Sequence, residues 1–245
     1  MRQDPSRREI IAAIGFGWLW PPNWFHRHVR FAEATFREIR HGEDRRRYLW
    51  IHGDERTAHH VLREHIRHHE GRAFLVESRV RNVKIKGGVL DPNRMFSRIG
   101  AEHNLRSQNP SWDSPQIIEA LNRLDRDRNE FLAQILPREP EGLIVALHNN
   151  GTGYSLQDEV TISDATALND PSHPDEFLLC TMRADFEKIA KGPYNVLLQH
   201  TAPPDDDGSL SRLCAVRNIR YVNIEAAHGN AAGQRAMLAW LETVL

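Results

Sequence analysis

The sequence has only two cysteines, Cys180 and Cys214, among its 245 residues. Two thiols cannot form a zinc knuckle, and a disulfide between them is expected only if the protein leaves the reducing cytosol. Cysteine therefore offers this chain one disulfide at most, and two free thiols otherwise.

The sequence also lacks an excess of charge of either sign and has no block of basic residues. Its formal net charge is -1, from 32 Lys and Arg against 33 Asp and Glu. Nucleic-acid-binding domains carry basic patches, often with aromatic residues between them, so nucleic acid is not expected as a partner. Hydrophobic content of 40% and charged content of 27% are ordinary for a globular protein. The length suits one large α/β domain.

No apolar run is long enough to span a bilayer as a stable helix. Residues 10–20 come nearest, between the pair Arg7-Arg8 and the pair Pro21-Pro22. A basic start before about eleven mostly apolar residues is typical of export signals, and paired arginines resemble a twin-arginine signal. The other interpretation is an amphipathic helix packed on the domain. Residues 1–40 are predicted to be a signal peptide or an N-terminal helical extension, which leaves both periplasmic and cytoplasmic localisation open.

Residues 41–245 alternate apolar runs with amphipathic stretches, and this pattern predicts an α/β domain with a sheet covered by helices. The expected strands are Tyr48–Ile51, Ala73–Val76, Leu143–Leu147, Asn195–Gln199 and Tyr221–Ile224. The expected helices are Thr57–His69, Ser114–Ile135, Pro174–Ala190 and Gly233–Val244. Long loops are expected over residues 78–113, 149–173 and 200–219, and loops of that length usually carry function or disorder.

A His-x-x-Glu pair, His52 and Glu55, follows the first expected strand and precedes a helical pattern. Imidazole and carboxylate three residues apart can bind one divalent metal ion together, and catalytic zinc sites commonly use two histidines and one glutamate. Such a pair can arise by chance in a chain with 14 histidines, as Glu64 and His68 show. His52 differs because it ends an apolar strand, where an unpaired polar ring would be costly.

Three further groups follow expected strands or stand in a loop between them. His148 ends the apolar run 143–147, and it is either a third ligand or a core histidine at a strand end. Arg94, next to Asn93, offers a planar fork that fits a carboxylate, although such a pair in a loop is often only a turn. Glu225 ends the last expected strand, where a carboxylate is either paired structurally or acts as a base beside a metal.

The order of these motifs resembles the zinc carboxypeptidase superfamily, and more closely its compact succinylglutamate desuccinylase and aspartoacylase branch. The similarity covers about residues 47–228. It implies a three-layer α/β sandwich with a mixed, mostly parallel sheet flanked by helices. It also implies one zinc ion per chain. The implied roles are zinc ligation by His52, Glu55 and His148, carboxylate binding by Asn93 and Arg94, and catalysis by Glu225.

The sequence departs from the family pattern at two positions. The family usually has an aspartate two residues before the third ligand, where this chain has Ala146. It also places an arginine some eight residues before the substrate-binding arginine, to stabilise the oxyanion. That position is Lys86, which supplies the charge without the fork, and Lys84 and Arg81 stand nearby.

The resulting hypothesis is a zinc-dependent hydrolase of an amide bond next to a free carboxylate. Its partner would be a small peptide, such as a cell-wall peptide if the protein is exported, or an N-acyl amino acid. The alternatives are a metal-free module on the same fold that binds carboxylates or peptides, and an α/β domain whose polar strand ends coincide by chance. The sequence does not fix the oligomeric state.

Overall fold

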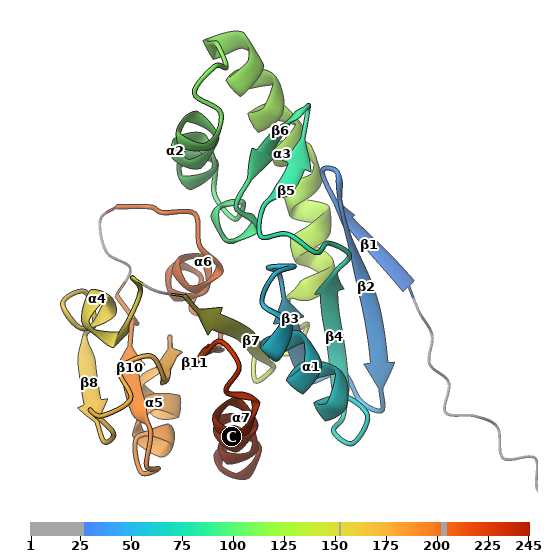
Figure 1. The fold of residues 1–245 in the computed structure, drawn as a ribbon. Coiled ribbons are helices and arrows are strands. Elements are labelled where there is room, and N and C mark those ends of the chain that lie inside the picture. The colour runs from blue at the N-terminus through green and yellow to red at the C-terminus, as the bar shows by residue number, and fades with distance from the viewer. Residues whose placement is uncertain (1–26, 152, 202–204) are drawn as a thin grey trace, which may run out of the picture.

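The computed structural model describes residues 27–151, 153–201 and 205–245. These residues form one large sheet with helices against both faces, as Figure 1 shows. From edge to edge the strands are β1 (Arg27–Phe31), β2 (Ala34–His41), β4 (Gly71–Val76), β3 (Arg46–Trp50), β7 (Leu143–Asn150), β11 (Tyr221–Ala227), β9 (Phe177–Cys180), β10 (Asn195–Leu198) and β8 (Ala165–Leu168).

The sheet is mixed, as predicted, but it is parallel only in its middle. The four strands β4, β3, β7 and β11 run in one direction. β9 and β10 are parallel to each other and antiparallel to β11. The remaining neighbours, β1 with β2, β2 with β4 and β10 with β8, are antiparallel. Within this sheet, as far as the structure describes the chain, parallel and antiparallel pairs are thus equal in number, and "mostly parallel" is wrong for the sheet as a whole.

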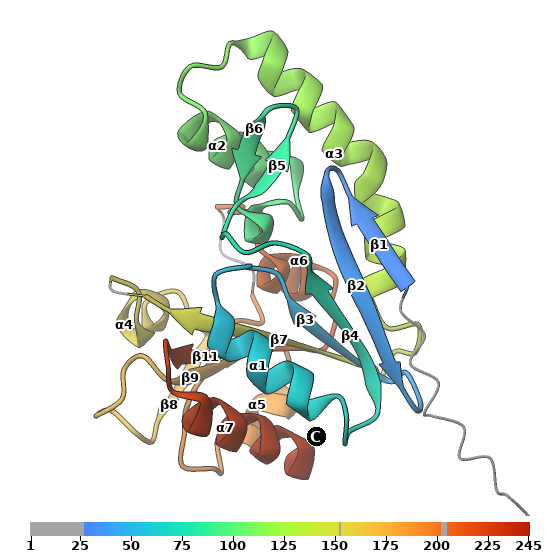
Figure 2. The same cartoon turned by 45° about the vertical axis from the view of Figure 1, so that its right-hand side comes forward.

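Helices cover both faces, which gives three layers (Figure 2). α1 (Arg56–His65), α5 (Arg183–Ile189) and α7 (Ala231–Val244) lie on one face. The Tyr48 hydroxyl donates to Glu242 of α7 on that side. α3 (Ser114–Ile135), α4 (Leu156–Val160) and α6 (Leu210–Val216) lie on the other face, where Phe36 of β2 packs on Phe131 of α3. The predicted sheet covered by helices is confirmed.

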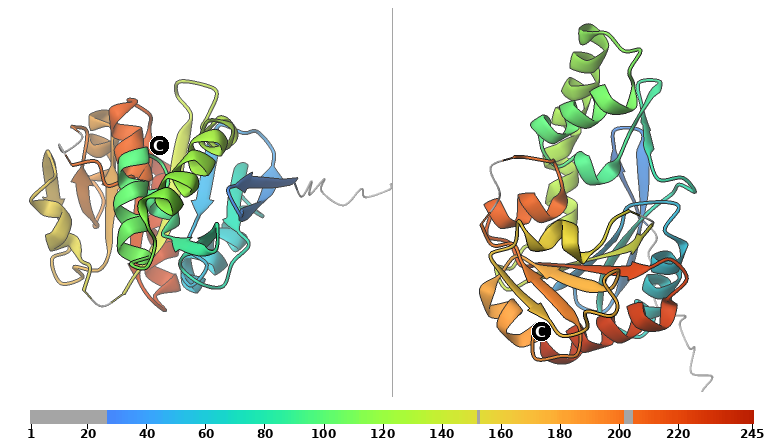
Figure 3. Two further views of the ribbon diagram at one scale, coloured as in Figure 1. Left: turned by 90° about the horizontal axis from the view of Figure 1, so that it is seen from above. Right: turned by 60° about the vertical axis from the view of Figure 1, so that its left-hand side comes forward.

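One lobe of the chain projects beyond the sheet, as the right-hand view of Figure 3 shows. It consists of the hairpin β5 (Val83–Ile85) and β6 (Gly88–Leu90), the short 3-10 helix η1 (Pro92–Arg94), α2 (Arg98–Gln108) and the start of α3. The predicted loop 78–113 is therefore largely structured. The other two predicted loops also contain elements, α4 and β8 in one and α6 in the other.

The predicted strands are all present, and three of the four predicted helices are correct to within a few residues. The helix expected over 174–190 is wrong, because its first half is β9 and only its second half, α5, is helical. The run Phe177–Cys180 is uniformly apolar and fully buried, and such a short run fits a buried strand as well as a helix.

Residues 27–40, predicted as part of an N-terminal extension, form β1 and most of β2 in the main sheet. Residues 1–26, where the export signal or helix was predicted, lie outside the described part of the chain. Within the described part, no helix combines the length and apolarity needed to cross a membrane. Cys180 and Cys214 are both buried and free, so they form no disulfide here.

Candidate metal centre

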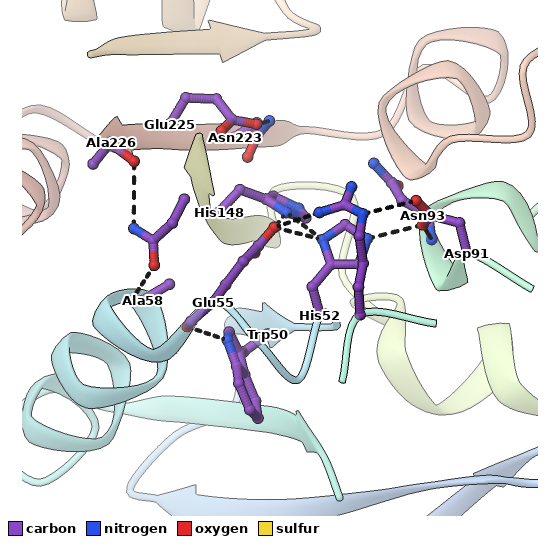
Figure 4. Close-up of polar contacts among 12 residues, drawn as sticks. Trp50, His52, Glu55, Ala58, Asp91, Asn93, His148, Asn223, Glu225 and Ala226 are labelled. Atoms are coloured by element: carbon purple, nitrogen blue, oxygen red, sulfur yellow. Dashed lines mark hydrogen bonds and ion pairs between the residues drawn. The ribbon is translucent and has the colours of Figure 1, made fainter. Parts of the chain in front are cut away.

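His52, Glu55 and His148 converge at the carboxyl ends of β3 and β7, as Figure 4 shows. His52 Nδ1 lies 2.7 Å from Glu55 Oε1 and 3.2 Å from His148 Nδ1. His148 Nδ1 lies 3.1 Å from Glu55 Oε2. One donor atom from each of the three residues falls within 4.8 Å of the other two. A buried group of this kind can hold a metal ion.

The turn between β3 and α1 brings the side chains of His52 and Glu55 next to each other. Glu55 is the N-cap residue of α1, and its backbone carbonyl accepts a hydrogen bond of 2.8 Å from Trp50 Nε1. Gly53 within the turn lies so close to Ser78 that a side chain would meet backbone atoms at 2.6 Å. Asn149, next to His148, accepts from the backbone N–H of Ala58 in α1. These contacts fix α1 and the ends of β3 and β7 relative to one another.

Asp91, the residue before η1, fixes the orientation of the His52 ring. Its Oδ1 lies 2.8 Å from His52 Nε2, so Nδ1 is the nitrogen that faces Glu55 and His148. The same oxygen also accepts the backbone N–H of Asn93 at 2.8 Å. Ligating histidines typically hold their second nitrogen against a carboxylate in this way. Asp91 thus supplies a carboxylate that contacts the second ring nitrogen of His52. Position 146, where the family pattern expects such a carboxylate, is alanine.

The three ligand candidates are nearly inaccessible to solvent, and the pKa values of His52 and Glu55 reflect their pairing. Burial lowers the pKa of His52, but the carboxylates of Asp91 and Glu55 outweigh it and raise the pKa to about 9. Burial raises the pKa of Glu55, and His148 and His52 outweigh it and hold that pKa well below its usual range. Without a metal, the centre is therefore a protonated histidine held between carboxylates.

Glu225 on β11 faces the metal centre from the neighbouring strand. It is paired in register with His148 across β7 and β11, and it is 6% exposed. Burial raises the pKa of Glu225 to about 7, His148 opposes that shift and Glu55 adds to it. Asn223 Nδ2 donates to Glu225 Oε1 at 2.9 Å. A carboxylate that titrates near neutral pH beside a metal centre is suited to proton transfer.

A cavity of about 410 Å³ opens over these groups on the sheet face that carries α4 and α6. Asn93 and Arg94 line it, as the sequence predicted. Arg94 Nη1 donates to Asp207 at 2.7 Å. Gly208 makes this pairing possible, because its φ of 76° suits glycine and a Cβ at that position would lie 2.5 Å from the Arg94 carbonyl oxygen.

The structure does not bring Lys86 to the cavity, which corrects the choice of oxyanion-stabilising cation. Lys86 lies at the tip of the β5–β6 hairpin, and its Nζ is 2.6 Å from Glu119 of α3. Arg81, which the sequence offered as the other cation, does line the cavity. Its Nη1 donates to Glu55 and its Nε to Asp91, each at 3.2 Å.

The chance match Glu64 and His68 lies outside the metal centre. Both side chains are exposed, Glu64 on α1 and His68 just after it, and Glu64 pairs with Arg235.

The sequence did not predict the roles of Asp91 and Asn223, and it did not predict that Glu159 lines the cavity. Asp91 had a visible signal, since a carboxylate before Pro-Asn caps a turn, but its contact with His52 depends on chain folding over 39 residues.

Comparison of the chain with family models, curated proteins and solved structures gives no match. Its function therefore has to be inferred from its own residues and their arrangement.

Proposed function

We propose that the protein is a zinc-dependent hydrolase that cleaves an amide bond next to a free carboxylate. The observation that carries this proposal is the convergence of His52, Glu55 and His148 beneath a cavity that also contains the buried carboxylate of Glu225. A purely structural cluster would not need a fourth titratable group on the neighbouring strand, facing the same cavity.

The residues of the centre fit zinc. Two imidazole nitrogens and a glutamate are a ligand set of catalytic zinc sites that keep a position open for water or substrate. Glu55 Oε2 is buried, and although His148 Nδ1 lies 3.1 Å from it, it accepts no hydrogen bond of good geometry among the described residues. A buried carboxylate oxygen without a well-aligned partner is costly, and a cation bound there would remove the cost. The contact of His52 Nε2 with Asp91 leaves Nδ1 as the ligand atom.

When bound, zinc supplies a Lewis acid that polarises a carbonyl and lowers the pKa of water towards about 7. Glu225 takes the proton of the attacking water and passes it to the leaving amine. Its buried position makes the carboxyl basic enough for the first transfer and acidic enough for the second. Asn223 holds the Glu225 carboxylate in place through a hydrogen bond of 2.9 Å.

Arg94 binds the substrate carboxylate, and Asn93 lines the cavity beside it. Only Nη1 of Arg94 contacts Asp207 among the described residues, so its remaining N–H groups can form the planar pair that a carboxylate accepts. Arg81, in place of Lys86, is the cation nearest the metal ligands and is assigned to the oxyanion. This set of roles, and the order of its motifs along the chain, support membership of the zinc carboxypeptidase superfamily.

The proposal is tested with Glu225→Gln, which keeps the shape of the side chain and removes its basicity. We expect zinc to bind as in the wild type while turnover falls about 100- to 10,000-fold. The measurement is hydrolysis of a panel of N-acyl amino acids, dipeptides and peptidoglycan fragments by zinc-loaded protein. Turnover that survives the substitution contradicts the role of Glu225. A wild type with no affinity for zinc would favour the metal-free binding module instead.

A further inference from the structure

A second pocket lies behind the turn that carries His52 and Glu55. Its volume is about 430 Å³, and it shares no lining residue with the metal cavity. Gly53 in the turn and Arg56 at the start of α1 line this pocket, whereas His52 and Glu55 line the metal cavity. The turn is therefore a wall between two separate pockets.

Three neighbouring strands build the floor of this pocket. Arg37 of β2 and Trp50 of β3 both pair with Leu75 of β4 in the register of the sheet. Residues aligned across a sheet project their side chains to the same face. Here it is the face that carries α1, because the rings of Trp50 and His59 pack with their centroids 4.3 Å apart.

The floor contains a cationic group that lacks a partner. Leu75 and Trp50 are buried, which leaves the guanidinium of Arg37 as the charged group among them. The Nε of Arg37 is buried and donates no hydrogen bond to another described residue. A buried donor without an acceptor is costly, and an anion bound in the pocket would remove that cost.

The pocket continues along α1. A further pocket has Arg56 and His59 in common with the one behind the turn. We call the two together the basic groove, and its arginines are Arg37, Arg56, Arg63, Arg67 and Arg79. None of these five arginines forms an ion pair or a side-chain hydrogen bond with another described residue.

The basic groove has too few carboxylates to balance its arginines. Its lining includes two, Glu77 and Glu64. Glu77 lies 3.2 Å from His28 Nε2, and Glu64 lies 2.8 Å from Arg235 Nε, so each pairs with a residue outside the groove. Arginines that share a recess without carboxylates of their own create a positive potential, and such a potential favours an anionic ligand.

The positions of the arginines favour a ligand with more than one phosphate. A guanidinium binds phosphate oxygens in pairs, which makes arginine the preferred residue for this group. Arg56 and Arg63 are seven residues apart on α1, so they lie on one face and roughly 10 Å apart along the helix axis. Two linked phosphates can contact the floor and α1 together, whereas one phosphate contacts the arginines at only one of these places.

We propose that the basic groove binds a ligand that carries a diphosphate group, with one phosphate over Arg37 and the other along α1 near Arg63. This inference does not depend on the proposed reaction, because none of the arginines of the groove lines the metal cavity. The diphosphate can belong to a soluble molecule or to a lipid headgroup, and the experiment below distinguishes these two sources.

The test measures the binding of inorganic pyrophosphate by calorimetry. The protein is stripped of metal, because pyrophosphate itself binds zinc, and the salt is kept at about 0.15 M to screen distant charges. We expect pyrophosphate to bind at least about tenfold more tightly than orthophosphate, because it contacts more of the arginines. Pyrophosphate that does not bind, or that binds no better than orthophosphate, overturns the inference.

Two variants locate the bound anion. Arg56→Gln and Arg79→Gln each remove an exposed arginine of the groove, and each should weaken pyrophosphate binding about tenfold. Arg183→Gln is the matched control, because Arg183 is also exposed and is the first residue of a helix, α5, outside the groove. It should bind as the wild type does. Binding that is lost in Arg94→Gln but unchanged in Arg56→Gln would place the anion in the metal cavity and overturn the inference.

Sedimentation with vesicles distinguishes the two sources of the diphosphate. Wild type and Arg56→Gln are mixed with phosphatidylcholine vesicles that contain phosphatidylinositol bisphosphate, and with vesicles that lack it. Wild type that sediments only with the first vesicles, while Arg56→Gln stays in solution, assigns the groove to a lipid headgroup. Wild type that binds pyrophosphate but stays in solution with both kinds of vesicle assigns the groove to a soluble diphosphate.

Discussion

The two ends of the cavity handle buried charge in opposite ways. At the metal end, His52 lies between the carboxylates of Glu55 and Asp91, and Arg81 contacts both of those carboxylates. At the end that carries α4, Glu159 is held by two neutral donors, the hydroxyl of Tyr154 and the side-chain amide of Gln199. The metal end must therefore release a proton before a cation can enter, whereas the Glu159 carboxylate has no charged partner among the described residues.

Removing a ligand at the metal end should have the largest effect. We expect His148→Ala to lose zinc binding and all zinc-dependent activity, because the two remaining ligands cannot hold the ion against solvent. The control is His60→Ala, which removes an exposed histidine of α1 outside the centre. Zinc titration against a competing chelator measures both. Equal zinc affinity in the two variants would show that His148 is not a ligand.

Asp91→Asn should have a smaller effect of the same kind. The amide can still bond to His52 Nε2, but it no longer provides the negative charge that makes the ring a better donor. Losing an outer partner of this type typically weakens metal binding about 10- to 100-fold. Zinc titration against a competing chelator measures this loss of affinity. The control is Asp113→Asn, a substitution at the exposed N-cap of α3. An unchanged zinc affinity would mean that Asp91 serves only to cap η1.

Zinc affinity at the metal end should also depend on pH. Because the pKa of His52 is raised to about 9 in the metal-free protein, zinc must displace a proton at lower pH. We expect affinity to rise up to about tenfold per pH unit between pH 6 and 8. The stability that protonated His52 gives the metal-free fold is present in full below about pH 6.5 and is lost as pH rises through about 9. A zinc affinity that is constant between pH 6 and 8 would contradict the pairing of a protonated His52 with Asp91 and Glu55.

Lys86→Ala should have the smallest effect, because Lys86 pairs with Glu119 on an exposed surface outside the cavity. We expect hydrolysis to be unchanged and the free energy of unfolding to move by no more than about 0.5 kcal/mol. Arg81→Ala, in contrast, should slow hydrolysis. A large loss of turnover in Lys86→Ala would return the oxyanion role to the lysine and overturn the assignment to Arg81.

The strand ends that carry the metal centre could be predicted from the sequence because periodicity and polarity agree there. Each of the runs before His52, His148 and Glu225 is apolar and β-prone, and a polar residue ends each run or follows it. The carboxyl ends of parallel strands meet at one edge of a sheet, so the three side chains were expected together. In the structure, β3, β7 and β11 are adjacent and parallel.

Features that depend on the path of the chain through space could not be predicted. Lys86 was assigned by counting residues along a family pattern, but the count does not reveal a hairpin whose tip has positive φ at residues 86 and 87 and turns the side chain towards α3. Strands β1 and β2 were missed because arginines alternate with their apolar residues, as expected for antiparallel strands with one solvated face. Glu159 has no local signal, since its partner Gln199 is 40 residues away.

The central claim is that His52, Glu55 and His148 hold one zinc ion beside a carboxylate that does the proton transfer. The most direct measurement is the zinc content of metal-stripped protein after dialysis against zinc, for the wild type, Glu225→Gln and His148→Ala. We predict about one zinc per chain in the first two proteins and none in the third. A folded wild type that takes up no zinc, or a His148→Ala variant that takes up as much as the wild type, would contradict the claim.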